Sequence, residues 1–213
     1  MAAASGLSES QKQSLARLYK VMAEPQTAGG RYEMPLSRRI ECDEVYPGIF
    51  LGDDSSARKT ELLARLGITH VLNAAEGHDF GQVDTSQAYY RESGITYLGL
   101  PLMDLPSANI SKFFDTAVKF IDNALASKDG YVAGKILVHC LMGMSRSPTL
   151  VVAYLISKKG MTTEEAMRLI LRRREIRPND GFLLQLLELE DKANSSKYTS
   201  RVLTPQSSKK KSK

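Results

Sequence analysis

The sequence predicts an α/β domain, because strand patterns alternate with helix patterns along most of its 213 residues. Residues 135–139 form a short apolar run typical of a buried strand. Residues 147–158 follow closely and are apolar on nearly every side, as expected of a central buried helix. Residues 111–127 carry the clearest amphipathic stripe. Strands interleaved with helices in this way make an α/β domain.

Turn and cap signals place the remaining elements. Strands are expected at 44–51, 68–73 and 95–100. Helices are expected from Ser8 to just before Pro25, at 60–66, at 86–93, at 162–174, and from Asn179 or Asp180 onward. Ser8 with Gln11 and Thr162 with Glu165 have capping-box spacing, and Gly67 and Gly94 are helix stops. The residues that share one face of the first helix are Leu15, Leu18, Tyr19 and Met22.

Three parts are predicted along the chain: an N-terminal extension with a short helix at 1–41, a main domain at 42–193, and a basic, disordered tail at 194–213. The tail holds Lys197, Arg201, Lys209, Lys210, Lys211 and Lys213 and no acidic residue. The net charge of +5 therefore comes from the tail, and the rest of the chain is close to neutral. Such a tail can be a nuclear address or a contact for RNA or anionic lipid, but a solvated end is the favoured interpretation, so no nucleic-acid partner is expected.

Composition narrows the class of protein. No apolar run approaches transmembrane length, and the first residues lack the apolar core of a signal peptide. The only cysteines are Cys42 and Cys140, which is no disulfide framework, and the histidines have no zinc-site spacing. We therefore expect a cytoplasmic or nuclear protein without metal or cofactor. The sequence leaves its oligomeric state open.

The segment from His139 to Ser147 carries most of the functional information. Cys140 and Arg146 lie at the two ends of a short loop between the strand at 135–139 and the helix from Ser147. Such a loop directs backbone N–H groups at one centre, beside the positive end of a helix dipole. The sequence therefore predicts an anion site with a thiolate at its base.

The residue types in this loop suit phosphate chemistry. Helix N-termini and nearby cations favour the thiolate form of a cysteine, which is the nucleophilic form. Gly143 allows a tight turn, Arg146 can hold two phosphate oxygens at once, and the Ser147 hydroxyl can assist departure of the thiolate. The alternative is that Cys140 is simply a small buried apolar residue, which this combination of neighbours makes the weaker interpretation.

His139 invites comparison with Cys–His proteases. Adjacent residues of a strand point to opposite faces, so His139 cannot serve Cys140 as a base and is interpreted as a buried residue that orients the loop. The loop also lacks the Gly-Lys-Ser/Thr ending of a nucleotide P-loop. An acid for the leaving oxygen is needed elsewhere, and Asp104, between prolines in a loop after a strand, is either that acid or an ordinary turn residue.

At these residues the chain resembles the cysteine-dependent protein phosphatases, within them the small dual-specificity branch, and most closely its vaccinia-H1-related members. The motif matched is His-Cys-x-x-Gly-x-x-Arg-Ser at residues 139–147, and the segments 66–77, 93–99, 145–151 and 174–183 are also similar. The likeness runs from about Cys42 to Lys192.

The resemblance implies a central, mixed but mostly parallel sheet flanked by helices, as in protein tyrosine phosphatases. It implies hydrolysis of phosphotyrosine and phosphoserine/threonine esters through a cysteinyl-phosphate, with phosphorylated signalling proteins such as MAP kinases as partners. Asp104 falls where the family keeps its general acid. Loop residues 141–146 would bind the substrate phosphate, Arg174 would reach a second phosphate, and Phe80 either walls the pocket or packs ordinarily.

The loop departs from its relatives at Leu141, Met142 and Met144, where apolar side chains replace charged and aromatic ones. Ser145 stands before the arginine. The backbone N–H groups still bind phosphate, but the rim of the site becomes more apolar. Two alternatives therefore stay open: the same chemistry on a phosphoinositide, an RNA 5′-phosphate or a phosphoglucan, or a non-catalytic phosphopeptide-binding module.

Overall fold

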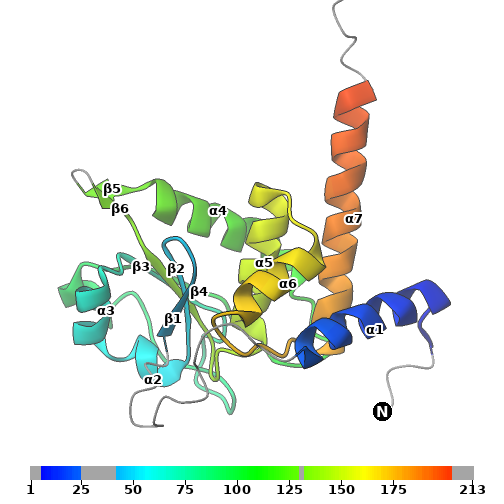
Figure 1. Cartoon of the computed structure of the whole chain (residues 1–213). Coiled ribbons are helices and arrows are strands. Elements are labelled where there is room, and N and C mark those ends of the chain that lie inside the picture. Colours follow the sequence, from blue (N-terminus) through cyan, green and yellow to red (C-terminus); the bar gives the residue numbers. More distant parts are fainter. Residues whose placement is uncertain (1–5, 25–41, 130–131, 203–213) are drawn as a thin grey trace, which may run out of the picture.

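The computed structural model describes residues 6–24, 42–129 and 132–202, and its centre is a five-stranded sheet. The strands are β1 (Cys42–Tyr46), β2 (Ile49–Gly52), β3 (His70–Asn73), β4 (Thr96–Gly99) and β7 (Ile136–His139). Their spatial order is β1-β2-β7-β3-β4, and only the β1–β2 pair is antiparallel. The predicted mixed, mostly parallel sheet flanked by helices is confirmed (Figure 1).

The expected strand at 44–51 is wrong as a single element, because it folds into the β1–β2 hairpin. Pro47 and Gly48 make the turn, and Tyr46 pairs with Ile49. Gly48 has a φ of 77°, the left-handed backbone that the second central residue of a Pro-Gly turn requires. The reversal adds one antiparallel strand to the parallel sheet.

Helices cover the two faces of the sheet unequally (Figure 1). The smaller core contains residues of α2 (Asp54–Ala57) and α3 (Thr60–Leu66) against one face of the strands. The larger core lies on the other face, under α4 (Phe114–Ala126), α5 (Arg146–Lys159), α6 (Thr163–Leu171) and α7 (Asp180–Val202). Strand residues alternate between these cores: Ile136 and Val138 belong to the larger and Leu137 to the smaller.

Helix α5 is the centre of the larger core, as its composition predicts. All residues from Arg146 to Ile156 are buried. The helix follows β7 directly, so its N-terminus is fixed at the carboxyl end of a central strand. Ligand sites of α/β folds form at this edge of the sheet.

Two predicted helices differ in the structure: one is mostly replaced by turns, and the other is shorter than expected. The segment 86–93 contains turns and a short 3-10 helix, η4 (Arg91–Ser93), instead of a full helix, although Gly94 ends it in the left-handed conformation as expected. The helix expected to reach residue 174 ends at Leu171. The amphipathic segment 111–127 is confirmed as η5 (Ser111–Phe113) followed by α4. A separate antiparallel pair is formed by β5 (Lys128–Asp129) and β6 (Val132–Ala133).

The first helix, α1 (Glu9–Ala23), begins with the predicted capping box of Ser8 and Gln11. Its buried side chains are Leu15, Leu18 and Val21, whereas Tyr19 is 45 % exposed, so the expected face is only partly right. These three residues join the larger core, and the helix packs on α6 and α7. The N-terminal helix is therefore part of the folded body.

The last helix is longer at its C-terminal end than the sequence predicts. Helix α7 continues to Val202, so residues 194–202 are helical although a disordered tail was expected from residue 194. Residues 25–41 of the predicted N-terminal extension and residues 203–213 of the predicted tail lie outside the described residues. None of the described helices is both long and apolar enough to span a bilayer.

Candidate active site

Residues 140–145 form the loop between β7 and α5, and its carbonyl groups point outward. The backbone N–H of Asp54 donates to the carbonyl oxygen of Leu141 over 3.1 Å. The backbone N–H of Arg177 donates to that of Met144 over 2.7 Å. When the carbonyls of consecutive peptides face outward, their N–H groups face the centre of the loop, which makes an anion-binding concavity.

Arg174 holds the middle of the same loop from outside. Its Nε donates to the carbonyl of Gly143 over 3.0 Å and its Nη2 to that of Met142 over 3.1 Å. Its Nη1 donates to the Asp43 carboxylate over 3.1 Å. The side chain is only 12 % exposed. All three guanidinium nitrogens are thus engaged on the outer side of the loop, and contact of Arg174 with a second substrate phosphate stays a prediction.

Gly143 is required by this arrangement. Its φ of 67° lies in the left-handed region. A Cβ at this position would lie 2.4 Å from the carbonyl oxygen of Gly52 and 2.5 Å from Nη2 of Arg174. Any larger residue would push the loop away from both neighbours.

Cys140 lies at the base of the loop and is 1 % exposed. Its Sγ accepts hydrogen bonds from the backbone N–H of Gly143 at 3.2 Å and from the Ser147 hydroxyl at 3.3 Å. Both donors stabilise negative charge on sulfur more than a neutral thiol. The structure thus brings Cys140, Gly143 and Ser147 together as the sequence predicts.

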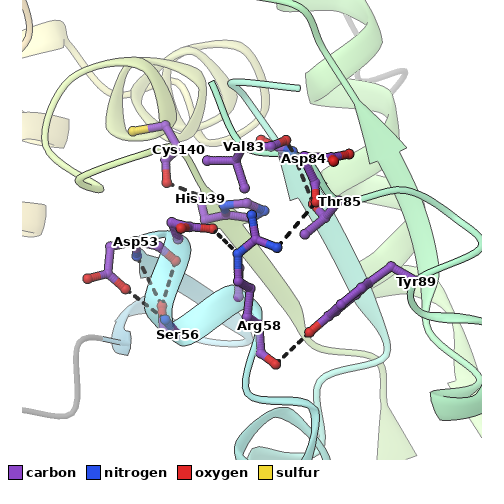
Figure 2. A network of polar contacts seen from close by, with 12 residues as sticks. Asp53, Ser56, Arg58, Val83, Asp84, Thr85, Tyr89, His139 and Cys140 are labelled. Carbon is purple, nitrogen blue, oxygen red and sulfur yellow. Dashed lines mark hydrogen bonds and ion pairs between the residues drawn. The ribbon is translucent and has the colours of Figure 1, made fainter. Parts of the chain in front are cut away.

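His139 points away from the thiol, as the alternation along the strand requires (Figure 2). Its Nδ1 lies 3.3 Å from the carbonyl oxygen of Cys140, and a carbonyl only accepts, so the contact places the ring proton on Nδ1. The ring is fully buried, and burial lowers its pKa to about 4. A neutral histidine that fixes the first peptide of the loop agrees with the predicted orienting role.

Arg146 connects the loop to two other segments. Its Nη1 donates to the carbonyls of Gly81, at 2.8 Å, and Leu102, at 3.0 Å. Its buried Nε has no hydrogen-bond partner among the described residues, although it forms an ion pair with Oδ2 of Asp104 at 3.6 Å. An unsatisfied, buried, charged donor is costly unless an anion fills the site.

Asp104 is fixed beside the loop, where the sequence predicts an acid. Its Oδ1 accepts from the Ser145 hydroxyl at 2.8 Å and from Nδ2 of Asn179 at 2.9 Å. The side chain remains 34 % exposed, so it is accessible to a ligand. Because Oδ1 already has two donors, Oδ2 is the oxygen available to carry a proton.

Asn179 is the site residue that the sequence analysis missed. It was interpreted only as a helix cap, and it does cap α7, since its Oδ1 accepts from the backbone N–H of Phe182 over 3.0 Å. Its amide also holds Asp104, which no sequence spacing indicates. Ser145 also orients Asp104. It stands at the N-cap position of α5 but makes no side-chain cap bond, and its hydroxyl instead donates a hydrogen bond to the Asp104 carboxylate.

The predicted pocket-wall and rim residues differ in exposure. Phe80 is 98 % exposed, so it does not pack ordinarily, and its role as a pocket wall stays a prediction. Leu141 is half-buried and packs against the larger core, and Met144 is also half-buried. Met142, at 64 % exposure, is the expected rim residue that does face solvent.

Cys42 and Cys140 lie on opposite faces of the sheet. Cys42 pairs with Gly52, and Gly52 pairs with His139, so Cys42 shares the face of His139 and belongs to the smaller core. Burial raises the pKa of the Cys42 thiol to about 12. Among the described residues, no group of three or more His, Cys, Asp or Glu side chains lies together as a metal site needs.

The family profile of the dual specificity phosphatase catalytic domain matches residues 49–192. The chain belongs to this family. It is therefore a phosphatase, of the type represented by the atypical dual-specificity phosphatases. The narrower assignment to the vaccinia-H1-related branch stays a prediction.

Solved structures of two dual-specificity phosphatases and of one tyrosine phosphatase-like protein have the same fold. A mouse putative dual specificity phosphatase complexed with zinc tungstate is 26 % identical with a TM-score of 0.63, over 80 % of this chain and 97 % of that one. DUSP15 is 29 % identical with a TM-score of 0.61, over 78 % and 98 % of the two chains. The human tyrosine phosphatase-like serine/threonine/tyrosine-interacting protein is 33 % identical with a TM-score of 0.55, over 78 % and 100 %.

Proposed function

We propose that this phosphatase hydrolyses phosphotyrosine and phosphoserine/phosphothreonine monoesters in proteins through a cysteinyl-phosphate. The observation that carries the proposal is the Cys140 loop itself: its outward carbonyls, the hydrogen bonds that Sγ accepts from Gly143 and Ser147, and the buried Arg146, whose Nε makes no hydrogen bond and lies 3.6 Å from Oδ2 of Asp104. The mouse relative was solved in complex with zinc tungstate, and tungstate is a tetrahedral dianion like phosphate, which agrees with a protein that binds phosphate esters.

In the first step the Cys140 thiolate attacks phosphorus. An S–P bond forms while the P–O bond to the leaving group breaks, and the Asp104 carboxyl gives its proton, from Oδ2, to the leaving oxygen. Loop N–H groups and Arg146 hold the equatorial oxygens, where the transition-state charge lies. Asp104 is well placed for this role because its other oxygen is fixed by Ser145 and Asn179.

In the second step water attacks phosphorus and the S–P bond breaks. The Asp104 carboxylate takes a proton from the water, inorganic phosphate leaves, and the thiolate of Cys140 is regenerated. The Ser147 hydroxyl, 3.3 Å from Sγ, donates to the departing sulfur and so makes it a better leaving group. The groups that favour the thiolate at rest are the same groups that favour its release.

A phosphorylated protein, with signalling kinases as one class, is the substrate that the family resemblance favours. A phosphoinositide or another non-protein ester would undergo the same chemistry, and a binding module would need no nucleophile. The presence of Cys140 and its two donors argues against the module. The identity of the phosphate ester is what the experiment has to decide.

The experiment is a comparison of wild type, Cys140→Ser and Cys42→Ser on matched substrates. These are phosphotyrosine, phosphoserine and phosphothreonine peptides, kinase activation-loop peptides, vesicles containing phosphoinositides, and a 5′-phosphorylated RNA. Wild type and Cys42→Ser should release phosphate from peptides, and acid quenching should trap a phosphoryl group on the peptide that contains Cys140. Cys140→Ser should bind phosphopeptides without turnover. Phosphate release by Cys140→Ser would overturn the proposal. So would phosphate release by wild type from phosphoinositides or from the RNA with no release from any peptide.

A further inference from the structure

Large apolar side chains are exposed around the Cys140 loop. We call the following four the apolar rim: Phe80, Met103, Leu105 and Met142, which are 98, 42, 51 and 64 % exposed. The other exposed large hydrophobic residues in the described part of the chain are Tyr19 and Tyr89. Both of those tyrosine hydroxyls have hydrogen-bond partners, whereas the rim side chains have no polar group that solvent would satisfy. Exposed apolar residues gathered at one place mark a binding surface.

The rim is anchored to the catalytic groups. Arg146 binds the carbonyls of Gly81 and Leu102, and the neighbours of these residues in the chain are Phe80 and Met103. Leu105 follows Asp104, and Met142 lies inside the loop itself. Consecutive Cα atoms are about 3.8 Å apart. Each rim residue therefore either lies in the Cys140 loop or is the chain neighbour of Asp104 or of a residue that Arg146 contacts.

The three segments that carry the rim are poor in positive charge. Residues 77–82, 101–106 and 140–146 contain no lysine and a single arginine, the buried Arg146. Arg174, on the outer side of the loop, is bound to two loop carbonyls and to Asp43. Arg177 pairs with Glu175. In a substrate, a second phosphate or an acidic side chain beside the reacting phosphoresidue would face the apolar side chains of these three segments and find no cation on them to pair with.

We propose that the preferred substrates are singly phosphorylated protein segments with large apolar side chains directly beside the phosphoresidue. This inference rests on the proposed function. An extended peptide advances about 3.3 Å per residue, so side chains one or two positions from the phosphoresidue reach the rim. Their burial against Met103, Leu105, Met142 and Phe80 removes apolar surface of both partners from water.

The test compares phosphotyrosine peptides that differ only beside the phosphoresidue: leucine or phenylalanine, serine, glutamate, or a second phosphoresidue. Wild type should have a kcat/KM about tenfold higher on the apolar than on the acidic peptide, the change expected when part of one large side chain is buried. The double variant Met103→Gln, Leu105→Asn should lose most of this preference and keep its activity on a small aryl phosphate. Tyr89→Gln, at a residue as exposed as Met103, is the control and should retain the preference.

Phe80→Ser provides a second variant, and little effect on stability is expected because the side chain is almost fully exposed. It should reduce the same preference. Equal hydrolysis of all peptides by wild type, or faster hydrolysis of the acidic or doubly phosphorylated ones, would overturn this inference while peptide hydrolysis itself stands. Hydrolysis of phosphoinositides with no peptide hydrolysed would instead overturn the proposed function, and this inference with it.

Discussion

The side-chain amide of Asn179 donates from Nδ2 to Oδ1 of Asp104 over 2.9 Å, across 75 positions of sequence. The same side chain caps α7 through its Oδ1. One residue thus ties the candidate acid to the start of a long helix. The acid lies in a loop, and its carboxyl orientation depends on this tie and on the Ser145 hydroxyl.

Replacing Asn179 separates its two roles. Asn179→Asp keeps an N-cap acceptor but has no donor for Asp104, whereas Asn179→Ala loses both. We expect both variants to lower kcat on esters with poor leaving groups, by about tenfold, because misorientation of a catalytic group is costly. Only Asn179→Ala should lose about 1 kcal/mol of unfolding free energy. Kinetics over a series of aryl phosphates and urea denaturation measure the two effects, and equal stability loss in both variants would contradict the separation.

Asp104→Asn removes the proton donor but keeps the shape of the side chain. The expected loss is about 10²-fold or more in kcat for alkyl phosphates and poor aryl leaving groups, and little for a good leaving group such as p-nitrophenolate. A plot of log kcat against leaving-group pKa should therefore become steeper. An unchanged slope would assign Asp104 to the turn rather than to acid catalysis.

Arg174→Lys tests the outer support of the loop. Lysine keeps the charge but cannot donate to two carbonyls and a carboxylate in one plane. We expect a higher KM for every substrate, small aryl phosphates included, by roughly threefold to tenfold, because the whole loop loosens. A defect confined to doubly phosphorylated peptides would show instead that Arg174 contacts a second phosphate.

His139 should make the protein sensitive to acid. Burial lowers its pKa to about 4 from the ordinary 6.5, so between these values the unfolded chain binds a proton that the folded chain does not. Stability is therefore complete above pH 6.5 and falls as the pH drops toward 4, by about 2 kcal/mol between pH 7 and pH 5. Urea denaturation at both pH values, with His139→Gln as the comparison, measures this. The same loss in the variant would exclude His139 as the cause.

Cys42 should be neither a catalytic group nor a disulfide partner of Cys140. Its pKa is raised to about 12 by burial, so it stays a neutral thiol at physiological pH. Cys42 is two strands away from His139, about 10 Å by strand spacing, which is beyond the reach of a disulfide to the next residue. Cys42→Ala should therefore leave kcat unchanged. A Cys42–Cys140 disulfide found by mass spectrometry after peroxide treatment would refute this placement.

The local sequence pattern predicted an element correctly where the interactions that decide it act between residues close together in the chain. The Ser8 and Thr162 capping boxes, the stop at Gly67 and the buried strand before Cys140 are confirmed, because hydrogen bonds and backbone sterics within a few residues decide them. The hairpin at Pro47 was missed because strand-favouring residues on both sides outweighed the turn signal of Pro47-Gly48 in the expected strand at 44–51. The helix expected at 86–93 failed because tertiary contacts outweigh a weak local pattern there.

The sequence by itself determined the α/β class, the thiolate loop from Cys140 to Arg146 and the family, because these depend on residue types at short, fixed spacing. Only the tertiary structure decided that Arg174 supports the loop from outside, that Asn179 holds Asp104, and that Phe80, Met103, Leu105 and Met142 are exposed. These contacts join segments far apart in the chain. Their existence depends on how strands and helices pack, which no spacing along a single sequence encodes.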